Sequence, residues 1–89
     1  MALYKILSWA EIPTQIRAED DSDDVTLALD PRFMEHIDLL AAKRGLQSTD
    51  DYLGQWHWSD EQDRPGSARE VAEAVKAELE AKGLPDLRA

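Results

Sequence analysis

The chain has 89 residues, of which 19 are Asp or Glu and 10 are Lys or Arg, so its formal net charge at pH 7 is −9. A chain of this length has room for one domain with a modest hydrophobic core. The negative charge disfavours nucleic acid and anionic membranes as partners and favours a basic protein. The absence of cysteine excludes disulfides and thiolate metal sites and is compatible with a cytoplasmic protein, which we expect.

Two strands are predicted at the start of the chain. Residues 3–9 are apolar on both faces except at Lys5 and Ser8, a pattern typical of a central strand and not of a signal peptide. Residues 14–19 alternate apolar and polar side chains after Pro13, which stands where a strand can begin without losing a ladder hydrogen bond. No segment approaches the length of a transmembrane helix.

A third strand and a first helix follow directly. Residues 25–29 alternate in the same way, so we expect them to pair with residues 14–19 in an antiparallel hairpin. Asp30 and Pro31 then predict a helix start, because aspartate can cap a helix and proline needs no N–H at the first helical position. Gly45 predicts its end.

A second helix is predicted after Ser48, a capping residue. Tyr52, Leu53 and Trp56 would form its buried side, and we expect it to end near Trp58.

The last third of the chain predicts a loop and a third helix. Ser67 and Glu70 form a capping box and Gly83 forms a stop, which indicates a helix over residues 68–82. Its apolar stripe is thin, so we expect it to be peripheral. The predicted organisation is a compact domain, a linker, a C-terminal helix and a tail, at residues 1–60, 61–66, 67–83 and 84–89.

These elements predict an α+β fold in the order β-β-β-α-α-α. A three-stranded, mainly antiparallel sheet would be packed by two helices, with the C-terminal helix at the periphery.

Several short motifs carry a family resemblance. They are the W-x-x-I-P-x-Q-I run of residues 9–16, residues 31–33 with Ile37 and Asp38, and residues 45–46 and 50–53 with Trp56. In these motifs the chain resembles a small bacterial family described as virulence factor, over residues 3–58, with the third helix outside the resemblance. The resemblance implies no reaction, cofactor or catalytic residue, and it implies an interaction module.

Two groups of residues are candidates for binding a partner. The first is the acidic tip of the predicted hairpin, with Asp20, Asp21, Asp23 and Asp24. The favoured explanation is a solvated run of charge that prevents edge-to-edge pairing, and a docking patch for a basic partner is the alternative. The second is Trp58 with His57, because a helix ending there would leave Trp58 off its buried face, and tryptophan is common among interface hot spots.

The sequence offers no catalytic chemistry. It contains no phosphate-binding loop and no nucleophile elbow, and His57 with His36 gives fewer ligands than a catalytic zinc site needs. We therefore expect no enzyme activity, no cofactor and no metal.

The interpretation favoured by these features is a protein–protein interaction or accessory module, as a monomer or homodimer. The order strand, helix, helix also occurs in ribbon-helix-helix DNA-binding regulators and antitoxins, which gives one alternative. Two features disfavour this alternative. The outward side chains Thr26 and Ala28 can make few contacts with bases, and the flanking Asp24 and Asp30 carry the same charge as the DNA phosphates. A structural or subunit domain of a larger enzyme assembly is a further alternative.

Overall fold

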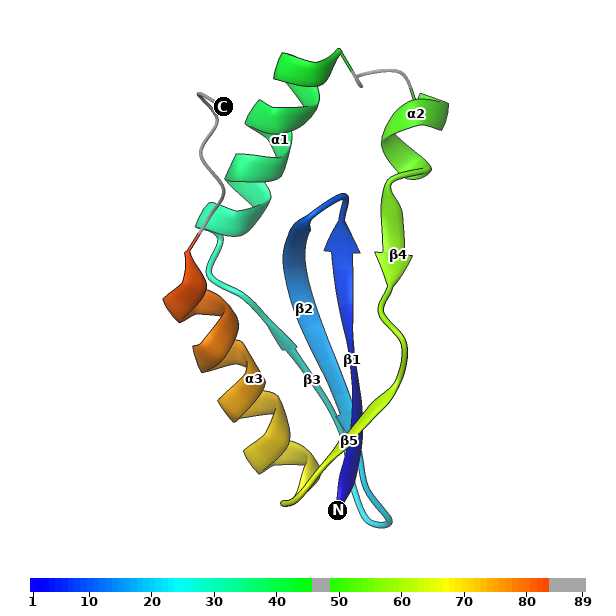
Figure 1. The fold of residues 1–89 in the computed structure, drawn as a ribbon, viewed down its shortest axis with the longest axis vertical. Coiled ribbons are helices and arrows are strands. Elements are labelled where there is room, and N and C mark those ends of the chain that lie inside the picture. The colour runs from blue at the N-terminus through cyan, green and yellow to red at the C-terminus, as the bar shows by residue number, and fades with distance from the viewer. Residues whose placement is uncertain (46–48, 84–89) are drawn as a thin grey trace.

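The computed structural model describes residues 1–45 and 49–83, and they fold as one antiparallel sheet with three helices. In chain order the elements are β1 (Ala2–Trp9), β2 (Ile12–Glu19), β3 (Asp24–Ala28), α1 (Arg32–Arg44), α2 (Thr49–Leu53), β4 (Trp56–Trp58), β5 (Gln62–Arg64) and α3 (Ala68–Lys82). Figure 1 shows α3 and α1 one after the other on the β3 side, with α2 leading into β4 on the β1 side.

The sheet confirms the α+β prediction and adds to it. The strand order is β3-β2-β1-β4, and β5 also pairs with β1, so β1 is the central strand as predicted. The hairpin of β2 and β3 forms in the predicted antiparallel sense, with Ile16 opposite Leu27. The two additional strands pair with the second edge of β1, β4 beside Leu7–Trp9 and β5 beside Ala2–Tyr4.

The positions of β4 and β5 correct two predictions. The second helix ends at Leu53, and Trp56 to Trp58 form a strand instead of its last turn. Residues 62–64 form a strand inside the segment predicted as a loop. Both short segments gain backbone hydrogen bonds from the free edge of β1, and such an edge cannot be recognised from their own sequences.

Ser59 joins these two short strands to β1. Its backbone N–H donates to the carbonyl of Ile6 at 2.8 Å, and its hydroxyl accepts from the N–H of Ile6 at 2.9 Å. The side chain thus supplies the acceptor that a strand backbone would otherwise provide, so both polar groups of Ile6 stay satisfied.

The C-terminal helix is part of the core, which corrects its predicted peripheral position. Ala68, Val71, Ala72 and Val75 are all buried, in one cluster with the sheet residues Ile16 and Ala18. Two of these four helix residues are alanines, whose small side chains let the helix approach the sheet closely, so a thin stripe suffices. The predicted capping box of Ser67 and Glu70 is present.

The first helix follows its sequence prediction except at its start. It begins at Arg32 with Pro31 at the N-cap, one residue later than predicted, and the carboxylate of Asp30 accepts a hydrogen bond from the N–H of Arg32 at 3.0 Å. Phe33, Ile37, Leu40 and Ala41 are buried, and Gly45 ends the helix with a left-handed φ of 71°. Leu53, predicted to be buried, is 57% exposed, because α2 is one turn long and its buried side is formed by Tyr52.

Tyr52 links α2 to the sheet. Trp9 donates a hydrogen bond from Nε1 to the Tyr52 carbonyl at 2.9 Å, and the two rings lie 5.5 Å apart. Trp56 meets Tyr52 edge to face at 6.3 Å. Ser48 and residues 84–89, predicted as a cap and a tail, lie outside the described residues.

Removing buried volume from α3 tests its place in the core. Val71→Ala should lower the free energy of unfolding by about 2 kcal/mol, because it deletes buried methyl groups and leaves a cavity. The matched change Ala81→Ser, at an exposed position of the same helix, should alter it by less than about 0.5 kcal/mol. Urea unfolding followed by circular dichroism measures both, and equal stability of the two variants would contradict the packing.

Candidate functional site

Helix α3 packs against one face of the sheet and leaves the other face uncovered. Cross-strand rows such as Ile6, Ile16 and Leu27 lie on the face that α3 covers. Side chains alternate along a strand, so the intervening residues point to the other side. We call this second side the open face, and it carries Leu3, Lys5, Leu7, Gln15, Arg17, Glu19, Thr26, Ala28 and Trp58.

Trp58 is held on the open face by its neighbours. It stands directly opposite Leu7 on β1 and is 43% exposed. The ammonium group of Lys5 lies 4.9 Å from the centre of its ring, a cation–π distance. The indole is therefore exposed to a partner while its orientation is supported from one side.

His57 does not join Trp58 in this surface. Adjacent residues of a strand point to opposite sides, so His57 faces away from the open face. Its Nδ1 lies 3.1 Å from the carbonyl oxygen of Gln55. Sequence reasoning placed the two residues together because it assigned them to a helix end.

Leu3 is the second exposed apolar residue of the open face, at 40% exposure. It lies directly between Glu19 on β2 and Asp63 on β5, its cross-strand neighbours. Two shallow grooves of about 150 and 280 Å³ meet at Leu3 and Glu19, and Glu61 lines the first of them. An apolar side chain is thus surrounded by carboxylates.

These carboxylates have no ion pair of their own in the described part of the chain, whereas the two cations nearby do have partners. Arg17 binds both oxygens of Asp24, at 2.7 and 3.2 Å, and Lys5 lies over Trp58. This pairing lowers the pKa of Asp24. The groups around Leu3 that remain available to a partner are therefore acidic.

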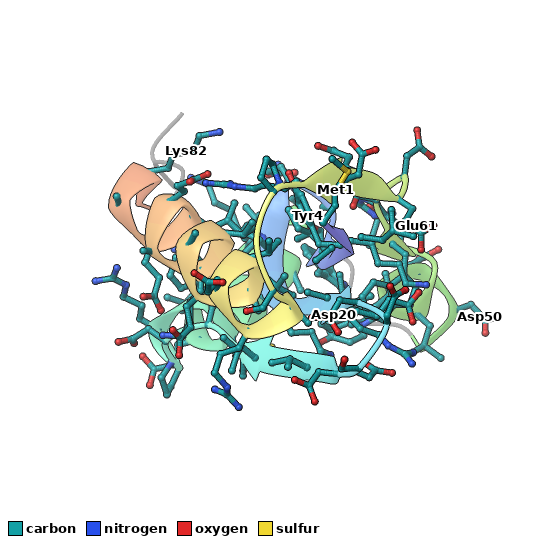
Figure 2. The ribbon with its side chains drawn as sticks, turned by 90° about the horizontal axis from the view of Figure 1, so that it is seen from below. Met1, Tyr4, Asp20, Asp50, Glu61 and Lys82 are labelled. Carbon is teal, nitrogen blue, oxygen red and sulfur yellow. The ribbon has the colours of Figure 1, made fainter. Side chains whose placement is uncertain are left out.

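The acidic tip divides into structural and exposed residues. Asp20 accepts three backbone hydrogen bonds at 2.7 Å, from Ala68 at the start of α3 and from Ser22 and Asp23 within the turn. These donors, Ala68 first, hold the pKa of Asp20 below its usual value. Figure 2 shows Asp20 beside the first turn of α3.

Two of the four predicted acidic residues therefore have structural roles. Asp20 closes the turn and supports the start of α3, and Asp24 is paired with Arg17. Asp21 and Asp23 have exposed side chains, and Asp21 lines the larger of the two grooves beside Leu3. The structure thus brings the tip and Trp58 to one face of the sheet, with Leu3 between them.

Sequence reasoning missed Leu3 and its flanking carboxylates. The available signal was that residues 3–9 are apolar on both faces, although only one face of a small sheet can be buried by the predicted helices. Glu19 and Asp63 are 44 positions apart in the chain, and only the pairing of both strands with β1 brings them together.

No group of three or more His, Asp or Glu side chains converges as a metal site would within residues 1–45 and 49–83. His36 is partly buried beside the exposed pair of Arg44 and Glu11, whose closest atoms are 2.6 Å apart. The hydrogen bond from Arg44 lowers the pKa of Glu11. None of the described helices combines the length and the apolar character that crossing a membrane requires.

Comparison with known protein families shows to which family the chain belongs. The family model described as virulence factor matches residues 7–83. The chain belongs to this family. The match includes α3, which corrects the expectation that the third helix lies outside the resemblance, and it agrees with the burial of α3 in the shared core. No curated protein and no solved structure matches the chain.

The carboxylate of Asp20 should make part of the stability of the protein dependent on pH. Because its folded pKa is lowered, its contribution is present above the ordinary aspartate pKa of about 3.9 and is lost as the pH falls through the folded value. Asp20→Asn replaces one acceptor oxygen by a donor, so the melting temperature should fall by several degrees at neutral pH. The difference from the unmodified protein should shrink in acid.

Asp21→Asn is the matched control, since its exposed side chain lies next to Asp20 in the same turn. Thermal melts of the three proteins between neutral and acidic pH measure the effect. A constant difference between Asp20→Asn and the unmodified protein across this range would contradict the assigned role.

Proposed function

We propose that this virulence factor family domain binds another protein through the open face of its sheet. The partner would present an apolar side chain flanked by Lys or Arg. The observation that carries the proposal is the position of Leu3, exposed between Glu19 and Asp63 with two grooves beside it. An apolar contact with oppositely charged neighbours is a common arrangement at specific interfaces.

Trp58 supports the same assignment. Tryptophan is enriched among residues that dominate binding energy, and a side chain already held in place loses less conformational entropy on binding. Lys5 provides that support from the side of Leu3. Glu61 and the acidic tip extend the negative charge around this surface, in keeping with the net charge of −9.

The proposed role is binding and not catalysis. The grooves at Leu3 are shallow and small compared with typical ligand sites of roughly 300 to 1,000 Å³. The side chains lining them are carboxylates, one lysine, one arginine, a tyrosine and apolar groups, without a nucleophile and base in contact.

Affinity capture with variants of the open face tests the proposal. A protein bound by the unmodified domain should be lost with Trp58→Ala and with Leu3→Asp, each weakening binding by about 2 kcal/mol or more. The control is Leu39→Asp, because Leu39 is also an exposed apolar residue, at 59%, but lies on α1. Isothermal titration with the purified partner measures each affinity.

Raising the salt concentration should weaken the same complex, since opposite charges at its rim are screened. Retention of the partner by both open-face variants, with unchanged melting temperatures, would contradict the proposal. Binding of the domain to random duplex DNA at low salt would instead favour the ribbon-helix-helix alternative.

A further inference from the structure

The outer edge of β3 is unpaired in the described part of the chain. The N–H of Leu29 donates to the carbonyl of Thr14 at 2.9 Å, which marks these two as a hydrogen-bonded pair. Because such pairs alternate in an antiparallel ladder, Thr26 and Ala28 turn their backbone groups away from β2. Both residues have exposed side chains.

Past its first residue this edge has none of the features within the strand that commonly block pairing. Asp24 begins β3 with a charge, but residues 25–28 are uncharged and contain no proline and no bulge. The opposite edge of the sheet is different, since it is divided between β4 and β5, each three residues long. The protein thus leaves one regular edge available.

Helix α3 presents a charged stripe beside this edge. The stripe consists of Arg69, Glu73, Lys76 and Glu80, whose spacing of four, three and four residues places them on one side of the helix. Glu73, Lys76 and Glu80 line a groove of about 340 Å³ together with Leu27 of β3. Along the helix the charges alternate in sign, positive at Arg69 and negative at Glu80. Within one copy they form two pairs, Arg69 with Glu73 at 3.6 Å and Lys76 with Glu80 at 3.1 Å, which a second copy would join into a network.

The stripe has the charges positive, negative, positive and negative from Arg69 to Glu80. A second stripe running in the opposite direction therefore places an opposite charge beside each of these residues. Helix α3 runs in the same direction as β3. Its first residue, Ala68, donates a hydrogen bond to Asp20 before the start of β3, and Glu80 near its end accepts one from the N–H of Asp30, after the end of β3, at 2.9 Å. A two-fold axis at Thr26 would therefore reverse strand and helix together. It would place Glu73 opposite Lys76 of a second copy, and Arg69 opposite Glu80.

We propose that two copies of this chain pair antiparallel through β3 and form one continuous sheet. In this register Thr26 faces Thr26 of the second copy, and Asp24 faces Ala28, so no like charges are directly opposed along the strands. The partly exposed Leu27 and the groove beside it become covered. The open faces of both copies remain on the same side of the joined sheet.

The mass of the protein in solution tests the strand pairing. The unmodified protein should have twice the 10.1 kDa of one chain by sedimentation equilibrium. Thr26→Pro should raise the dissociation constant at least about tenfold, because it removes an N–H that points outward and leaves the bonds to β2 intact. Thr26→Val keeps this N–H and should remain dimeric. Melting curves show whether each variant is folded.

Mixing two charge variants tests the helix stripe independently. Glu73→Lys and Lys76→Glu should each weaken the homodimer at least about tenfold, since like charges then face each other twice. An equimolar mixture of the two variants should form a heterodimer as strong as the original. A monomeric unmodified protein, an unaffected Thr26→Pro dimer, or the absence of a heterodimer would each overturn the proposal.

Discussion

Both the fold and the candidate site depend on β1 being hydrogen-bonded along both of its edges. One edge pairs with β2, and the other pairs first with β5 and then with β4, with Ser59 bridging the gap between them. A strand in this position must have side chains on both faces of the sheet, and α3 covers one of them. The same pairing places Leu3 between two carboxylates and Trp58 beside Lys5. The surface that we propose for partner binding is therefore a direct consequence of the central strand.

The acidic character of the protein has two separate roles. Some carboxylates hold the fold together: Asp20 joins the hairpin to the start of α3, and Glu78 binds Arg64 of β5 on the far flank of that helix. Others, such as Glu19 and Asp63, face solvent beside an exposed leucine. A charge of −9 does not distinguish these groups, and only their hydrogen-bond partners do. Surface ion pairs contribute little individually, so the backbone contacts of Asp20 matter more for stability than the count of charges.

The two proposed interaction surfaces do not overlap. The partner surface lies on the open face around Leu3 and Trp58, whereas the proposed self-association uses the backbone edge of β3 and the adjacent flank of α3. A joined sheet would present two partner surfaces on one side, and two linked sites bind a repeated partner more tightly than one. Within the chain, α3 connects the surfaces, because Asp20 fixes its start beside the acidic tip and Glu80 fixes its end beside β3.

The sequence by itself determined the elements with strong local signals: one strand that is apolar on both faces, two alternating strands that form the antiparallel hairpin, the helix from Arg32 to Arg44 and the capped helix from Ala68 to Lys82. It also indicated Trp58 and the acidic tip as candidate binding residues. Only the tertiary structure decided that Trp56 to Trp58 form a strand, that α3 is buried, and that Leu3 lies between Glu19 and Asp63. The physical reason is the range of the interactions. Caps, turns and periodicity act over a few residues, whereas a free strand edge and an uncovered sheet face attract segments from anywhere in the chain.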